Sequence, residues 1–137
     1  HKDQKRKNGE DYFTYHVLPV SYLVEILFMN KVSKDIINCT KIAAILHDTI
    51  EMSLTPKRTS KEIENLFGTP IILYVLSLSK NTVNKNYYDY IENISNNNIA
   101  RKVKIADILH NLHDTPSTKT AEKYKIALQI LWNKELN

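Results

Sequence analysis

Glycine and proline are scarce in this sequence, which has two glycines and four prolines among 137 residues. A β-sandwich needs many tight turns, which depend on these two residues, and disordered linkers are rich in them. A helix needs few of either, because both destabilise its interior. The scarcity therefore predicts an all-α fold, and the length suits one domain over residues 1–137.

Apolar residues recur every three to four positions in several segments, as on the buried face of a helix. This spacing predicts helices over 17–29, 36–50, 61–67, 71–78, 87–94, 99–112 and 120–136. Polar residues at 81–86 predict a loop. Thr59 and Glu62 have the form of a capping box for the third helix. Gly68 is expected to end that helix and Thr69 to cap the next, in a bundle of about six to seven helices.

The charge balance favours an anionic partner, because nineteen Lys and Arg against fifteen Asp and Glu give a net charge of +4. The basic segments carry no interleaved aromatic residues, which argues against a nucleic-acid-binding module. No run of about 18 apolar residues is present, and the charged N-terminal segment lacks the form of a signal peptide. These features predict a soluble cytoplasmic protein with no membrane partner. Cys39 is expected to be a small buried apolar residue.

A histidine and an aspartate stand side by side near the end of a predicted apolar helix, at His47 and Asp48. Adjacent donors of this kind can bind one metal ion. Glu51 follows on the same predicted helical face and could hold a water against the ion. A second pair, His113 and Asp114, lies at a predicted helix end, where polar residues satisfy the last carbonyl groups. We therefore interpret the second pair as structural.

Two more candidate metal ligands occur elsewhere in the chain, since a first-row metal ion needs further donors. His16 precedes an amphipathic helix, and Asp107 interrupts an apolar run in which an unpaired carboxylate would be costly to bury. Asn111 follows Asp107 by one helical turn and could orient a water or a substrate phosphate. Spacing alone leaves open the alternative that His16 is a capping or surface histidine and that Asp107 is solvated.

Several motifs match those of a known family in order along the chain. They are H-K-D-Q-K-R-K-N-G-E at 1–10, the histidine at 16, H-D-T-I-E at 47–51, F-G at 67–68, L-S-K at 78–80, I-A-R-K-V-K-I-A-D-I-L-H-N-L at 99–112, and a closing E-K-Y-K-I-A-L-Q-I-L. On these motifs the chain resembles the HD-domain phosphohydrolases, and within them the (p)ppGpp hydrolase domains of the RelA/SpoT group and their short stand-alone relatives. The resemblance covers nearly the whole chain and implies an all-helical HD-domain bundle.

The resemblance also implies roles for individual residues. One divalent ion, usually Mn²⁺ with Fe²⁺ or Zn²⁺ as alternatives, would be bound by His16, His47, Asp48 and Asp107. Catalytic roles are implied for Glu51, which would help to activate the attacking water, and for Asn111. Contacts with the substrate are implied for Arg6, Lys7, Lys104 and Asn111. The substrate would be a guanosine alarmone that loses its 3′ pyrophosphate, or a related phosphorylated nucleotide.

The chain departs from the family pattern at three places. Met52 stands where the hydrolases have a second acidic residue, and a thioether cannot accept a proton from water. One residue more than usual separates Gly9 from His16, so that either Tyr12 or Phe13 takes the usual aromatic position. The first helix of family domains would precede the start of this chain, and no synthetase segment follows.

Three functional classes are therefore compared. The first is a metal-dependent phosphohydrolase, and the second is a catalytically weak or inactive nucleotide-binding protein with the same fold, which the methionine favours. The third is a structural or nucleic-acid-binding helical module, which has only the positive charge in its favour. Metal content separates the third class from the other two, and turnover of ppGpp with added Mn²⁺ separates the first from the second.

Overall fold

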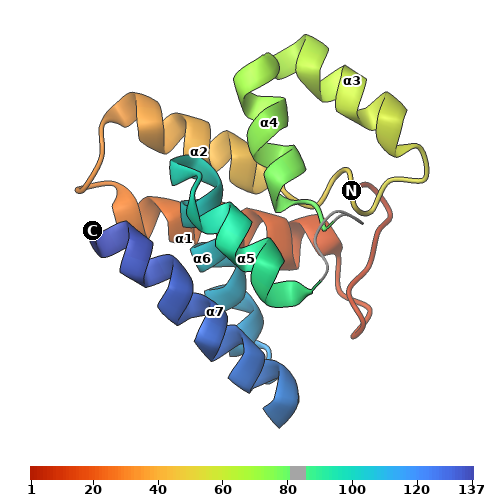
Figure 1. Cartoon of the computed structure of the whole chain (residues 1–137). Coiled ribbons are helices and arrows are strands. Elements are labelled where there is room, and N and C mark those ends of the chain that lie inside the picture. The colour runs from red at the N-terminus through yellow and green to blue at the C-terminus, as the bar shows by residue number, and fades with distance from the viewer. Residues whose placement is uncertain (81–85) are drawn as a thin grey trace.

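The computed structural model describes residues 1–80 and 86–137 (Figure 1). Its elements are a π-helix η1 (Phe13–Val17) and the α-helices α1 (Leu18–Phe28), α2 (Lys34–Leu46), α3 (Pro56–Phe67), α4 (Thr69–Leu78), α5 (Tyr87–Ser95), α6 (Asn98–His113) and α7 (Thr118–Leu136). Within these residues the β-pairing is limited to an isolated bridge between Lys5 and Asp11. The expected all-α bundle is confirmed. The predicted loop lies outside the described residues except for Asn86, which caps α5.

One bound in each of two helices differs from that expected by four or five residues. α2 ends at Leu46 rather than at residue 50, because residues 47–52 form turns. α3 begins at Pro56 rather than at residue 61, and proline suits this first turn because its missing N–H would have no partner there in any case. Thr59 consequently lies inside α3, and the predicted capping box is wrong.

Gly68 is the single residue between α3 and α4. Its N–H donates to the carbonyl of Glu64, and its φ of +91° is one that residues with a Cβ rarely adopt. The helix end predicted at Gly68 is confirmed. Thr69 is the first residue of α4 rather than its cap, because Gly68 also takes the N-cap position. The two helices therefore meet at a sharp corner (Figure 1).

Helix α6 runs through the middle of the bundle, where it contacts α1, α2, α4, α5 and α7. Its apolar side chains are therefore buried on several sides, among them Ile99, Val103, Ile105, Ala106 and Ile108. Any polar residue in the middle of this helix must then be buried as well, which is the setting of Asp107. Elsewhere in the bundle, Cys39 is half-buried against the core, as an apolar residue would be.

A second apolar cluster lies between α2, α3 and α4. Ile50, in the turns after α2, packs there with Ile63, Ile71, Ile72 and Val75. This contact anchors the segment that carries the adjacent histidine and aspartate. Among the described helices, none is both long and apolar enough to cross a bilayer.

Candidate metal centre and substrate pocket

The turns after α2 present three of the predicted site residues. His47 is the C-cap of α2, and the backbone N–H of Met52 donates to the carbonyl of Asp48 at 3.0 Å. The expectation that Glu51 shares a helical face with this pair is wrong, because the helix has already ended. Glu51 nevertheless lines the same pocket as Asp48, since the turns curl the chain back toward it.

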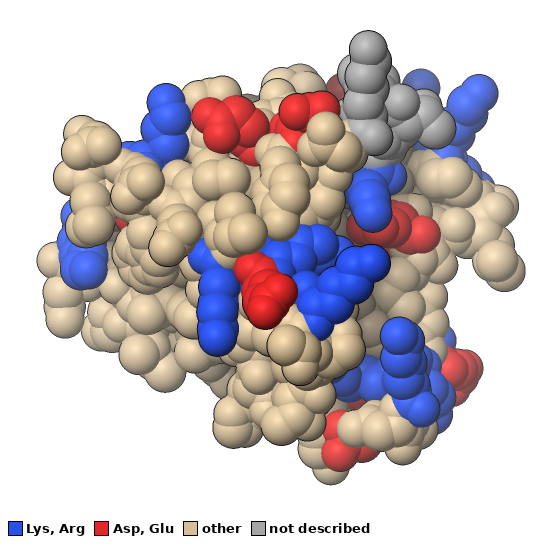
Figure 2. Space-filling model, turned by 60° about the horizontal axis from the view of Figure 1, so that its bottom comes forward, with Lys and Arg blue, Asp and Glu red and all other residues tan. Residues whose placement is uncertain are grey.

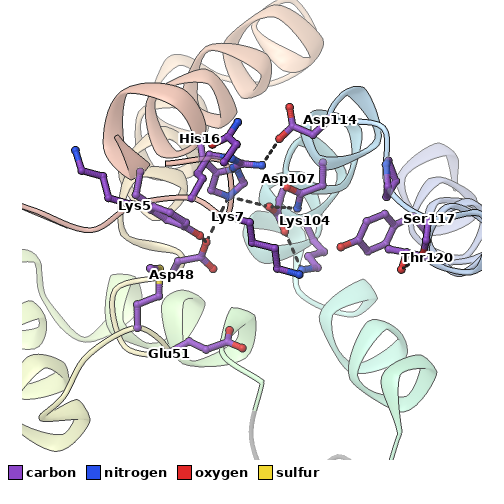
Figure 3. A pocket seen from close by; sticks show the side chains of 17 residues that line it. Lys5, Lys7, His16, Asp48, Glu51, Lys104, Asp107, Asp114, Ser117 and Thr120 are labelled. Atoms are coloured by element: carbon purple, nitrogen blue, oxygen red, sulfur yellow. Dashed lines mark hydrogen bonds and ion pairs between the residues drawn. The ribbon is translucent and has the colours of Figure 1, made fainter. Parts of the chain in front are cut away.

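Four predicted metal ligands converge from three separate segments, and Figure 3 shows three of them, His16, Asp48 and Asp107. The Nε2 atom of His16, in η1, lies 3.4 Å from Asp48 Oδ2 and 3.3 Å from Asp107 Oδ1. The Nε2 atom of His47 lies 3.0 Å from Asp48 Oδ2 and 3.5 Å from Asp107 Oδ1. Donor atoms of His16, His47 and Asp48 all lie within 4.8 Å of one another. Two imidazoles and two carboxylates thus face a common point.

The environment of His47 fits a cation at that point. Its Nδ1 lies 2.6 Å from the carbonyl of Ala44, which makes Nδ1 the protonated nitrogen and leaves the lone pair on Nε2 when the ring is neutral. Nε2 is buried and has no hydrogen-bond partner among the described residues, although Asp48 is close. A buried nitrogen without a partner is costly unless it binds an ion. The mixed nitrogen and oxygen donor set suits Mn²⁺, Fe²⁺ or Zn²⁺.

The electrostatics of the four residues also favour a positive charge between the carboxylates. Burial disfavours the charged form of His47, yet Asp48 and Asp107 outweigh it and raise the pKa of His47 to about 10. Burial alone would raise the pKa of Asp48, but the two histidines hold that pKa below its usual value. The two carboxylates therefore favour a positive charge at this point, which a divalent cation would supply.

His110, which the sequence did not single out, orients the first of these histidines. Its Nδ1 lies 3.0 Å from Nδ1 of His16, one of the two acting as donor. Burial and the neighbouring His16 lower the pKa of His110, which favours a neutral ring that can accept this hydrogen bond. His16 Nε2 is then free to face the carboxylates. The alternative of a surface histidine is wrong for His16, whose exposed fraction is 2%.

Asp107 is buried, and its carboxylate is fully engaged. Its Oδ2 accepts from Lys104 Nζ at 2.8 Å, and its Oδ1 accepts from Asn111 Nδ2 at 3.0 Å. Lys104 holds the pKa of Asp107 well below its usual value against the effect of burial. The solvated alternative is wrong for Asp107, because only 4% of the residue is exposed. Lys104 and Asn111 both line the pocket while they fix this carboxylate.

The N-terminal segment covers one side of the pocket. Its π-helix accommodates one residue more per turn than an α-helix of the same span, which matches the extra residue between Gly9 and His16. Tyr12 consequently turns into the pocket, where its hydroxyl donates to Asp48 Oδ2, whereas Phe13 is 39% exposed. Of the two aromatic residues that the sequence left open, Tyr12 is therefore the one that faces the pocket.

A cavity of about 830 Å³ is lined by three of the four converging donors, His16, Asp48 and Asp107, whereas His47 is not among its lining residues. Its lining includes the predicted substrate residues Arg6, Lys7, Lys104 and Asn111 and the predicted catalytic residue Glu51. Figure 2 shows Lys and Arg side chains gathered on one face of the molecule, with acidic side chains among them. The pocket thus combines candidate metal ligands with basic side chains.

Other lining residues were missed or misjudged in the sequence. Ser117, Thr120 and Tyr124 bring the start of α7 to the pocket. Asp114 lies at the helix end as expected, as the C-cap of α6, but it also lines the pocket and forms an ion pair with Arg6, which the sequence did not indicate. Its partner lies 108 residues earlier in the chain, and no local pattern could show that pairing.

Comparison with solved structures identifies the fold. One protein, described as a metazoan ortholog of SpoT that hydrolyzes ppGpp and plays a role in starvation responses, superposes with a TM-score of 0.70 and 20% sequence identity. The match covers 98% of this chain and 78% of that one. The chain has the HD-domain fold. No protein-family model and no curated protein sequence matches it.

Proposed function

We propose that this HD-domain protein is a metal-dependent phosphohydrolase that acts on a guanosine alarmone, as a 3′-pyrophosphohydrolase, or on a related phosphorylated nucleotide. The observation that carries the proposal is the convergence of His16, His47, Asp48 and Asp107, three of which line a cavity that also has basic side chains in its lining. The same fold in a protein described as hydrolysing ppGpp supports it. We also propose that residues 1–137 form a single domain.

In this proposal the four donors hold one divalent ion, with Mn²⁺ the first choice. Such an ion would acidify a water molecule and polarise a phosphoryl oxygen. Glu51 acts as the general base. Partial burial of its carboxyl group and the nearby Asp48 raise the pKa of Glu51, which makes it a stronger proton acceptor than a solvated glutamate.

The basic side chains bind and orient the substrate. Lys104 faces the pocket beside Asp107 and is placed to contact a phosphate near the scissile bond. Asn111 keeps one amide hydrogen and its carbonyl oxygen for the same purpose, since a single N–H is used by Asp107. Arg6 and Lys7 lie on the wall formed by the N-terminal segment, where the nucleoside and its other phosphates would sit.

A screen of phosphorylated nucleotides tests the proposal directly. The Mn²⁺-loaded protein should release pyrophosphate from ppGpp, or phosphate or pyrophosphate from a related nucleotide, and should hold one ion per chain. Phosphate and pyrophosphate are measured separately, because their pattern identifies the bond that is cleaved. If the protein neither binds a divalent ion nor hydrolyses any nucleotide, the result would favour a structural or nucleic-acid-binding helical module instead.

Substitution of Arg6 by Ala should weaken nucleotide binding by about 1 to 2 kcal/mol, the scale of a guanidinium stacked on an aromatic ring. Metal content should stay at the parental value, because Arg6 pairs with Asp114 and not with the four donors. Calorimetric titration measures the first quantity, and elemental analysis measures the second. Equal nucleotide affinity in the two proteins would mean that the basic N-terminal segment is simply solvated.

Met52 favours a second candidate function, a nucleotide-binding protein with little or no turnover. It lines the pocket next to Glu51 and offers no proton acceptor. If the missing acid limits catalysis, Met52→Asp should raise the rate by about tenfold or more, up to the 10²- to 10⁴-fold that general-base help typically contributes. Met52→Leu is the control, since it changes shape but adds no carboxylate. Nucleotide binding without turnover in both the parent and Met52→Asp would favour the binding protein.

A further inference from the structure

One ion pair joins two sides of the pocket and does not involve the converging donors. A terminal nitrogen of Arg6 donates to Asp114 Oδ2, which connects the N-terminal segment to the C-terminal end of α6 (Figure 3). The Arg6 side chain is 16% exposed and that of Asp114 is 42% exposed. Both residues line the cavity, so the pair forms part of its wall.

Both ends of the Arg6 side chain are held in place. Its backbone N–H donates to the carbonyl of Glu10 at 2.9 Å, and its carbonyl accepts from Gly9 at 2.9 Å. Gly9 has a φ of +86°, and this tight turn pins the backbone. Asp114, which is the C-cap of α6, then holds the guanidinium in place. The guanidinium plane therefore has a set orientation before any ligand arrives.

The pair also changes what Arg6 can bind. A free guanidinium binds phosphate through its N–H edges and stacks on an aromatic base through its face. Asp114 occupies one edge and compensates the charge, so a phosphate would have to approach a carboxylate of its own sign. The flat face remains suited to stacking. Arg6 is thus better suited to stack on a base than to bind a phosphate.

We propose that Asp114 is a positioning residue that makes Arg6 a platform for the base of a nucleotide rather than a clamp for phosphate. The pocket would then select phosphorylated nucleosides over inorganic polyphosphates of the same charge. This inference rests on the proposed function, because it assumes that a nucleotide enters the pocket.

Two ligands that share one methylenediphosphonate group test this role by binding alone. They are the methylene analogue of guanosine 5′-diphosphate and methylenediphosphonate, titrated at one fixed concentration of free Mn²⁺. The ratio of their affinities measures what the nucleoside adds. Asp114→Asn should lower this ratio by roughly tenfold, because the released charge of Arg6 turns to phosphate and leaves the base. Asp35→Asn, in the first turn of α2 and outside the pocket lining, changes the net charge equally and should leave the ratio unchanged.

A conservative variant separates positioning from the loss of a charge. Asp114→Glu keeps a carboxylate that can pair with Arg6, so the preference for the nucleoside ligand should be kept in part. An unchanged ratio in Asp114→Asn, an equal fall in Asp35→Asn, or a fall in Asp114→Glu as large as in Asp114→Asn would overturn the role of Asp114 alone. A parent protein that binds both ligands equally would overturn both this role and the nucleotide part of the proposed function.

Discussion

Replacement of Asp107 by Asn is expected to abolish binding of a divalent ion and to lower the free energy of unfolding by about 3 to 5 kcal/mol, the cost of breaking a buried charge pair from one side. Asp107 faces both metal-site histidines and accepts from Lys104 at 2.8 Å in a buried position. An amide in its place keeps the size but leaves the ammonium group without a counter-charge. Elemental analysis and chemical denaturation measure the two effects.

A second substitution separates these two effects. Lys104 is 15% exposed in its side chain, so Lys104→Met can remove the uncompensated charge and still fill the space. Asp107→Asn with Lys104→Met should recover much of the lost stability and none of the metal binding. One tightly bound ion per chain in the single variant would show that Asp107 is not a ligand. If the double variant were as destabilised as Asp107→Asn alone, the uncompensated charge of Lys104 would not be the cause of the lost stability.

Replacement of Glu51 by Gln is expected to slow nucleotide hydrolysis by about 10²- to 10⁴-fold, the contribution typical of a general base. Glu51 is the acidic residue of the pocket that does not belong to the four converging donors or to the Arg6 ion pair. Metal content should therefore stay at the parental level. Steady-state assays with the ion-loaded proteins measure the rate, and elemental analysis checks the loading.

The pH dependence of the rate gives an independent check. Because partial burial and Asp48 raise the pKa of Glu51, its carboxyl group loses its proton at a higher pH than a solvated glutamate, whose pKa is near 4.5. The parental rate should rise with pH as this group deprotonates, and Glu51→Gln should lack that rise. Glu92→Gln, on the exposed surface of α5, is the control. Parental rates in Glu51→Gln would remove the general-base role and favour the nucleotide-binding protein.

Local patterns were enough to predict most of the helices. The apolar spacing and the few glycines indicated an all-α bundle, because a helix repeats over neighbouring residues and needs no distant partner. The errors fell at helix ends. Pro56 and the turns after Leu46 shifted two bounds, since proline position and turn geometry outweigh periodicity there.

The types of the donor residues could also be read in the sequence. Asp107 stood out because a carboxylate in an apolar helix needs compensation, and the structure buries it beside Lys104 as that argument requires. His47 and Asp48 stood out as neighbours. That these residues hold an ion stays a prediction, although His16 and Asp107 now lie within 3.5 Å of them.

The partners of these residues were decided only by the tertiary structure. His110 contacts His16, 94 residues away in the sequence, and Asp114 contacts Arg6, 108 residues away. Neither contact can therefore be recognised from the spacing of residues or from neighbouring residues in the sequence. The turn of Tyr12 into the pocket depends on a π-helix, whose hydrogen bonding the side-chain pattern does not encode. The sequence by itself determined the helices and the chemistry available on them, because both follow from local propensity and residue type. The packing of α6 among five other helices determined which of those side chains meet, because burial is a property of the whole fold.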